Sequence, residues 1–82
     1  MSEERTSEKR AEDLWAMGHS IALINGVVGG AIDSDESAED RQDVVDRNTS
    51  HLTKMVAKED WDGEDMTAAN SAITAGNNYT AS

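Results

Sequence analysis

The stretch that decides the fold is residues 14–32, LWAMGHSIALINGVVGGAI, because it carries no charged side chain. The chain of 82 residues has twelve Leu, Ile and Val residues and no Phe, and seven of the twelve lie in this stretch. Its apolar side chains recur at intervals of three and four residues, which is the spacing of one helical face. We therefore predict a helix over residues 7–31. The residues of its apolar face are Leu14, Met17, Ile21, Ile24, Val28 and Ala31.

A row of small residues runs beside this face at intervals of four: Gly18, Ala22, Gly26 and Gly30. Such a row lets the backbone of another helix approach closely, and we interpret it as a surface for close helix packing. The alternative is that the glycines loosen the helix, at about 1 kcal/mol each relative to alanine. In that case the chain breaks or turns near Gly29 and Gly30, and both interpretations stay open at the level of the sequence.

Seventeen acidic and seven basic residues give the chain a formal net charge of −10. A high net charge with few large aliphatic residues is typical of chains that stay disordered alone. We therefore expect the protein to form homo-oligomers or to dock on a partner protein. The negative charge also disfavours direct binding to nucleic acid, because the phosphates would be repelled. The chain has no Cys, so it has neither disulfides nor thiolate metal ligands.

Two further helices are expected, over residues 36–58 and 64–77. In the first, acids concentrate near the beginning and bases near the end, an order that complements the helix dipole. The pattern Asp33-x-x-Glu36 resembles a capping box. The predicted fold class is all-α, either a helical hairpin or a small three-helix bundle.

The helices are expected to form a single domain over residues 1–82, with frayed tails at residues 1–6 and 78–82. Residues 60–63 are typical of a turn, and Asp62 is a candidate cap for the third helix.

The two tryptophans are the candidate anchors of the core or of an interface. Trp15 lies on the first predicted helix, where we expect it also to pack in the chain's own core. Trp61 lies between acids at a turn, so we expect it in an interface or in a covering layer. The predicted apolar contact with a partner consists of Leu14, Trp15, Ile21, Ile24, Val28 and Trp61.

The sequence lacks the motifs of catalysis and of metal binding. His19 and His51 are the only imidazoles, which is too few nitrogen ligands for a transition-metal site. A calcium loop beginning at Asp33 would need Gly at its sixth position and Glu at its twelfth, where the chain has Ala38 and Val44. No nucleophile, base and orienting group occur together. We therefore predict a non-enzymatic protein without cofactor or metal.

The acids form two clusters: residues 33–46 hold seven acids and one base, and residues 59–65 hold five acids and no base. If the second and third helices are antiparallel, these clusters lie at opposite ends of the second helix. The plain interpretation is a solvated face that keeps the protein soluble. The functional alternative is that spaced carboxylates imitate the phosphates of a DNA duplex. The candidate acids are Asp35, Glu36, Glu39, Asp40, Asp43, Asp60, Asp62 and Asp65.

The C-terminal thirty residues carry His51-Leu52-x-x-Met55, the turn Asp60–Asp65, and Ala72-Ile73-x-Ala75-Gly76-x-x-Tyr79. This stretch resembles small acidic accessory proteins of tailed bacteriophages. The resemblance implies a viral accessory protein that acts by binding, and it assigns no functional residues. We therefore expect a structural, assembly or decoration component of a virion.

Two other functions stay open. One is an acidic DNA mimic that inhibits a host nucleic-acid-binding defence protein, of the anti-restriction or anti-CRISPR type. The other is a small membrane-active protein that acts through residues 14–32, although His19, Asn25 and the glycines lower the hydropathy of that stretch. The first residues lack the basic and then apolar pattern of a secretory signal. We expect the protein in the host cytoplasm or in the virion.

Overall fold

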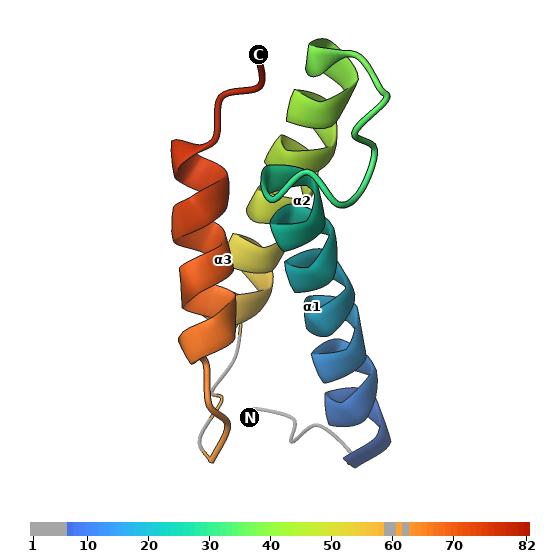
Figure 1. The fold of residues 1–82 in the computed structure, drawn as a ribbon. Helices are drawn as coiled ribbons and strands as arrows, with labels where there is room; N and C mark the ends of the chain where they lie inside the picture. Colours follow the sequence, from blue (N-terminus) through green and yellow to red (C-terminus); the bar gives the residue numbers. More distant parts are fainter. Residues whose placement is uncertain (1–6, 59–60, 62) are drawn as a thin grey trace.

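The computed structural model describes residues 7–58, 61 and 63–82, and these residues form three helices packed side by side (Figure 1). The helices are α1 (Ser7–Val28), α2 (Ala38–Lys58) and α3 (Thr67–Asn78). Helices that follow each other in sequence run antiparallel, and each helix contacts both others. The all-α prediction is therefore confirmed, in the form of a three-helix bundle rather than a hairpin.

The first helix ends at Val28, three residues earlier than predicted, because the chain turns at Gly29 and Gly30. Gly30 has a φ of 80°, a left-handed conformation that favours glycine. The N–H of Ala31 donates to the carbonyl of Gly26 at 2.8 Å, and the N–H of Gly30 donates to that of Val27 at 3.1 Å. These two bonds form a Schellman motif, which satisfies the last carbonyls of α1. Gly30 is thus a helix terminator, and its assignment to a close-packing surface is wrong.

The beginnings of α2 and α3 also differ by a few residues from the prediction. Ser37 caps α2, since its Oγ accepts a hydrogen bond from the N–H of Asp40 at 3.1 Å, and the helix begins after it. Before α3, the Oδ1 of Asp65 accepts a hydrogen bond from the N–H of Thr67 at 2.9 Å. The predicted cap Asp62 lies outside the described residues.

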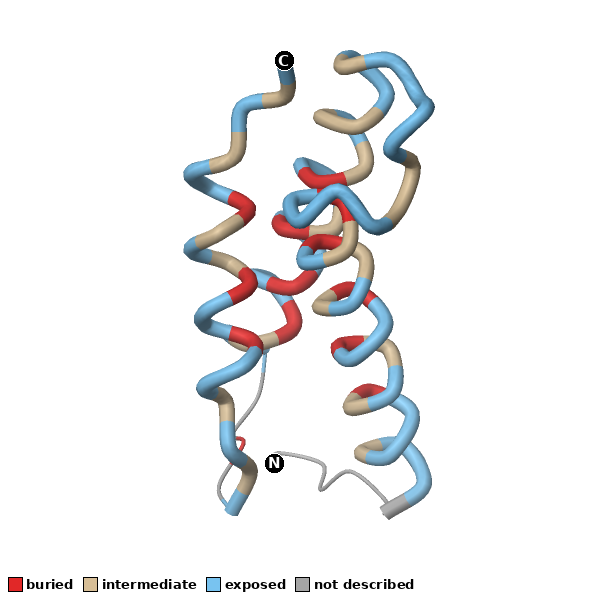
Figure 2. The backbone as a smooth tube through the Cα atoms, viewed as in Figure 1, coloured by how far each residue is buried: buried red, intermediate tan, exposed pale blue. Residues whose placement is uncertain are grey.

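The core follows the line where the three helices meet, and buried residues face inward from each of them (Figure 2). Ile24, Leu52 and Val45 are its largest fully buried side chains. The small residues of α3 allow that helix to lie close to the other two. The buried hydrophobic residues are Met17, Ile24, Val27, Val45, Leu52, Met55, Trp61, Ala69 and Ala72.

A close approach between helices occurs between α2 and α3, away from the predicted row of small residues. Gly76 of α3 is buried against the side chain of Thr49 of α2, so closely that a Cβ at residue 76 would overlap the threonine hydroxyl. The hydroxyl of Thr49 is itself buried and has no hydrogen-bond partner within the described chain. The absence of a side chain at Gly76 therefore allows α2 and α3 to approach closely at this point.

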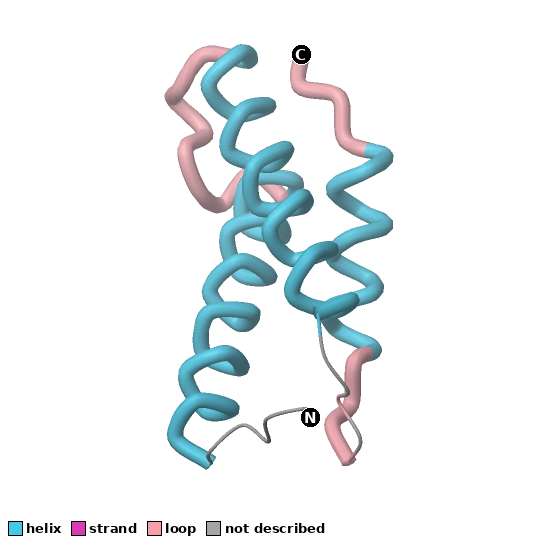
Figure 3. The backbone as a smooth tube through the Cα atoms, turned by 180° about the vertical axis from the view of Figure 1, so that it is seen from behind, coloured by secondary structure: helices cyan, strands magenta, loops and turns pink. Residues whose placement is uncertain are grey.

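The residues after α3 are held against the beginning of α2, at the end of the bundle that also carries the loop of residues 29–37 (Figure 3). Arg41 donates to the Tyr79 hydroxyl at 3.2 Å and to the main-chain oxygen of Ser82 at 2.9 Å. Gln42 donates to the carbonyl of Tyr79 at 3.2 Å and accepts from the N–H of Ala81 at 2.7 Å. Two polar side chains of α2 thus contact residues 79–82, part of the tail for which the sequence predicts fraying.

Candidate binding surface on helix α1

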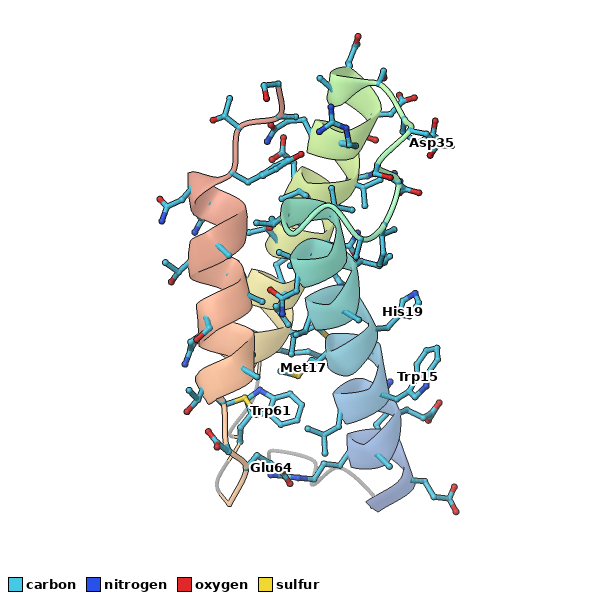
Figure 4. The ribbon with its side chains drawn as sticks, in the orientation of Figure 1. Trp15, Met17, His19, Asp35, Trp61 and Glu64 are labelled. Carbon is cyan, nitrogen blue, oxygen red and sulfur yellow. The ribbon has the colours of Figure 1, made fainter. Side chains whose placement is uncertain are left out.

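The interface prediction for Trp61 is wrong, because the structure places this indole in the core with only 8% of its surface exposed. Its Nε1 donates a hydrogen bond to the carbonyl of Met55 at 3.1 Å. The guanidinium of Arg10 lies 5.5 Å from the centre of the ring, and the Nε of Arg10 lies 3.3 Å from Glu64. Figure 4 shows Trp61 beside Met17, between the helices. The indole thus lies inside the bundle, with its N–H group hydrogen-bonded.

The prediction that Trp15 packs in the chain's own core is also wrong, since this residue lies outside the core with 72% of its surface exposed. Its ring stacks on that of His19, with centroids 5.5 Å apart and planes within 5°. Figure 4 shows both side chains on the side of α1 that faces away from the rest of the bundle. The large apolar surface of this tryptophan is therefore available to a partner.

Trp15 belongs to a row of exposed, uncharged residues that we call the outer face of α1. Its members are Ala11, Trp15, Gly18, Ala22 and Asn25. Their spacing alternates between four and three residues, which is the spacing of one seam of a coiled coil. Apart from the backbone of α1 itself and the two adjoining residues, no atom of the described chain lies within 4 Å of where a Cβ of residue 18 would be, so this face is open at its centre.

The predicted close-packing row is thus divided among three environments. Gly18 and Ala22 are exposed on the outer face of α1, Gly26 lies against the side chain of Ile32, and Gly30 ends the helix. None of the four packs against another helix of the bundle in the part of the chain that the structure describes.

The predicted apolar contact is smaller than expected. Ile24 is fully buried in the chain's own core, and Leu14 and Ile21 are half-buried against that core. Val28, at the end of α1, is 38% exposed. Of the predicted set, Trp15 and Val28 are the large apolar side chains that a partner could reach, because the others are buried or half-buried in the core.

One polar pair escapes prediction from the sequence. The Oγ of Ser20 lies 3.0 Å from the Nδ1 of His51 and joins α1 to α2 by a hydrogen bond. Ser20 is only 2% exposed, so no substrate can reach its oxygen, and we interpret the pair as a structural link rather than a nucleophile with its base. The sequence signal that could have revealed the pair is the place of Ser20 on the inward face of the helix, at helical spacing from Met17 and Ile24.

The acids lie at both ends of the bundle, but α2 does not connect them by a continuous acidic surface. Residues 35–43 contribute the exposed acids Asp35, Glu36, Glu39, Asp40 and Asp43 at one end, and exposed Asp65 lies at the other. Asp60 and Asp62 lie outside the described residues. After Asp46, the exposed charged side chains of α2 are basic: Arg47, Lys54 and Lys58. The Nε of Arg47 lies 3.0 Å from an oxygen of Asp43.

One acid has a perturbed titration. The pKa of Asp65 lies below its ordinary value of 3.8, because the side chain and the main-chain N–H of Thr67 both donate hydrogen bonds to the carboxylate. In the described chain, no three His, Asp or Glu side chains come together as metal ligands. None of the helices described above combines the length and the hydropathy that a membrane crossing needs.

No protein family, curated protein or solved structure matches this chain.

Proposed function

We propose that this protein works by binding another protein through the outer face of α1, as a structural or assembly component. The observation that carries the proposal is Trp15, a large aromatic side chain left 72% exposed on a helix that the core covers only on its other side. Tryptophan is enriched among the residues that dominate protein interfaces, where its burial contributes most of the affinity.

The chemistry of the surrounding surface supports this role. No charged residue occurs between Leu14 and Ile32, so a partner can cover the part of the face from Trp15 to Asn25 without removing a charge from water. Gly18 and Ala22 leave room beside the indole for a backbone or a flat side chain. The assembly role comes from the resemblance of residues 51–79 to accessory proteins of tailed bacteriophages, which implies action by binding.

The test is affinity purification from the native host or from virions, with the wild-type protein and three variants. Trp15→Ala removes the anchor, and Ala22→Glu places a charge in the middle of the face. Ala68→Glu makes the same exchange at an exposed position of α3 and is the matched control. We expect a protein that co-purifies with wild type and with Ala68→Glu to be lost with both α1 variants. The same co-purifying proteins from all four baits would contradict the proposal.

A second candidate function is binding to a basic protein surface through the acids of residues 35–43. These five exposed acids lie at one end of the bundle, and among the described residues only Asp43 forms an ion pair with a base. Their crowding supports imitation of DNA phosphates, whereas Arg47 and Lys54 interrupt any longer acidic strip.

Salt and DNA competition separate this second candidate from the first. Binding through the acids would weaken steeply with salt and would compete with DNA for the target. The neutral triple variant Glu39→Gln, Asp40→Asn and Asp43→Asn would abolish it. Binding that withstands both salt and this variant would exclude the DNA-mimic function.

A further inference from the structure

We infer that the outer face of α1 takes a basic segment of a partner protein, with an arginine of that segment stacked on Trp15 and paired with Glu8 and Glu12. We call the surface formed by these three residues the arginine site. The inference rests on the proposed function and names the chemistry of its partner.

The two acids of the site lie on the same side of α1 as the exposed tryptophan. Glu8 and Glu12 are four residues apart, and Trp15 follows Glu12 by three, so each is a neighbour of the next on the helix surface. Both carboxylates are exposed. Like charges at this spacing repel each other, and a cation bound between them would remove the repulsion.

The two bases of α1 do not neutralise these acids in the part of the chain that the structure describes. The Nζ of Lys9 lies 3.4 Å from the Oδ1 of Asp13, and the Nε of Arg10 lies 3.3 Å from the Oε2 of Glu64. The outward side of α1 is therefore negative at its beginning and uncharged from Trp15 onward. A positive charge on the partner would complement it.

The indole of Trp15 offers one open side for such a cation. Its other side stacks on the ring of His19, with the planes within 5° of each other. Since 72% of the residue is exposed, the side away from the imidazole is accessible. The face of an indole attracts cations, most often the guanidinium of arginine.

A hollow in the surface of α1 joins the indole to the acids. Its described lining includes the methyl groups of Ala11 and Ala16, the indole of Trp15, and the side chains of Glu8 and Glu12. One lysine and one aspartate also line it, and they form the ion pair described above. A side chain that enters the hollow would thus meet an aromatic ring and two carboxylates together.

The other tryptophan of the chain shows which cation fits such a place. The guanidinium of Arg10 lies 5.5 Å from the ring centre of Trp61 and at the same time bonds to Glu64, the acid three residues after that tryptophan. Trp15 has an acid three residues before it, Glu12, and no arginine of its own chain pairs with that acid in the described structure. The missing member of the second set is therefore an arginine.

Arginine also fits better than lysine on chemical grounds. Its guanidinium is planar, so it can stack on the indole while its N–H groups donate to a carboxylate in the same plane. The ammonium of lysine is a compact, strongly hydrated charge that gains less from stacking.

A peptide titration tests the site on the full chain. The probe is a short alanine-rich peptide with arginine as its only charged residue, and the readout is the pair of indole N–H signals in the NMR spectrum. We expect the Trp15 signal to move with a dissociation constant of about 1 mM, because the site is open to water, and the Trp61 signal to stay. Replacing the arginine by uncharged citrulline should weaken binding about tenfold, and lysine should be intermediate. A Trp15 signal that does not move, or that moves equally with citrulline, would overturn the inference.

Matched acid variants show whether the cation recognises this site or only the net charge. Glu8→Gln with Glu12→Gln should weaken binding of the arginine peptide about tenfold. Glu36→Gln with Glu39→Gln removes two exposed acids at the opposite end of the bundle, with the same change in net charge, and should leave it nearly unchanged. Circular dichroism checks that both double variants stay folded. Equal weakening by the two pairs would refute a specific arginine site.

Purification with the same variants separates this inference from the proposed function. A partner that is lost with Trp15→Ala but kept by Glu8→Gln with Glu12→Gln would refute the arginine site and leave the binding role of α1 intact. A partner lost with both, and kept by Glu36→Gln with Glu39→Gln, would support both. If Trp15→Ala keeps every co-purifying protein, the proposed function fails and this inference fails with it.

Discussion

The indole N–H of Trp61 donates a hydrogen bond to the carbonyl of Met55, 3.1 Å away, across the connection between α2 and α3. Arg10 of α1 lies over the face of the ring, with its guanidinium 5.5 Å from the ring centre. Trp61 therefore contacts the first helix and the end of the second at once. It is the largest side chain of the core and closes one end of the bundle.

Of the two tryptophans, Trp61 should contribute far more to the stability of the fold than Trp15. We expect Trp61→Ala to cost about 3–5 kcal/mol, because it removes buried surface and leaves a cavity. A domain of this size has a total stability of roughly 4–12 kcal/mol, so much of the protein would unfold. Trp15→Ala, at an exposed site, should change the stability by less than about 0.5 kcal/mol. Urea unfolding at low protein concentration, followed by circular dichroism, measures both; equal losses would contradict the packing described for Trp61.

The contact between Gly76 and Thr49 makes an unusual prediction for a helix. Alanine normally stabilises a helix relative to glycine by about 1 kcal/mol. Gly76→Ala should nevertheless destabilise the protein, by roughly 1–3 kcal/mol, because its Cβ would collide with the threonine side chain. Gly18→Ala, where the space is open, should stabilise it by about 0.5–1 kcal/mol.

The collision itself can be tested by a second substitution. Thr49→Ala removes the colliding atoms, so the double variant Gly76→Ala with Thr49→Ala should recover most of the loss. Thermal unfolding of the four proteins gives the coupling between the two positions. Independent, additive effects would show that the two side chains do not meet.

Asp65 should make the protein less stable in acid. Its pKa is lower in the folded protein than the ordinary 3.8, so its contribution is complete above pH 3.8 and is lost as the pH falls through the folded value. Below both values, where the carboxyl is protonated, the stabilities of the wild type and Asp65→Asn should differ least. Carboxyl NMR titration of the folded protein checks the direction, and a folded pKa at or above 3.8 would refute the role of Thr67.

The C-terminal tail should be released by a change in α2. We expect Arg41→Met to free residues 80–82, because it removes the hydrogen bonds to Tyr79 and Ser82. The heteronuclear NOE of the Ala81 amide should fall, while that of Leu52 stays unchanged. Arg47→Met removes an exposed ion pair elsewhere on α2 and is the control. A tail that stays ordered when Gln42→Leu, which removes the bonds to Tyr79 and Ala81, is added to Arg41→Met would contradict these contacts.

The helices could be predicted from residue spacing and charge order, because those signals are local. The two tryptophans could not be placed, because each depends on a contact far away in the sequence. Trp61 is buried only because the turn returns it to Met55 and because Arg10 covers its face. Trp15 is exposed because the inward face of α1 is already filled by residues such as Met17 and Ile24.

The candidate site was predicted in part and for the wrong reason. Gly18 and Ala22 were identified as a small-residue surface, yet no helix of the bundle uses it. The small residue that does let two helices approach is Gly76, whose partner Thr49 lies 27 positions earlier in the chain. No periodic pattern within one helix reveals such a pair, since it depends on how α2 and α3 cross.

The position of Trp61 in the chain also has a consequence for synthesis in the cell. A ribosome completes α1 and α2 before it adds the residue that closes the core between them. Until then Met17, Ile24 and Leu52 lack part of their native cover. Nascent or prematurely terminated chains therefore expose apolar surface of the kind that chaperones bind and proteases remove. The part of the chain that is synthesised last is therefore the part that covers the apolar core formed by the first two helices.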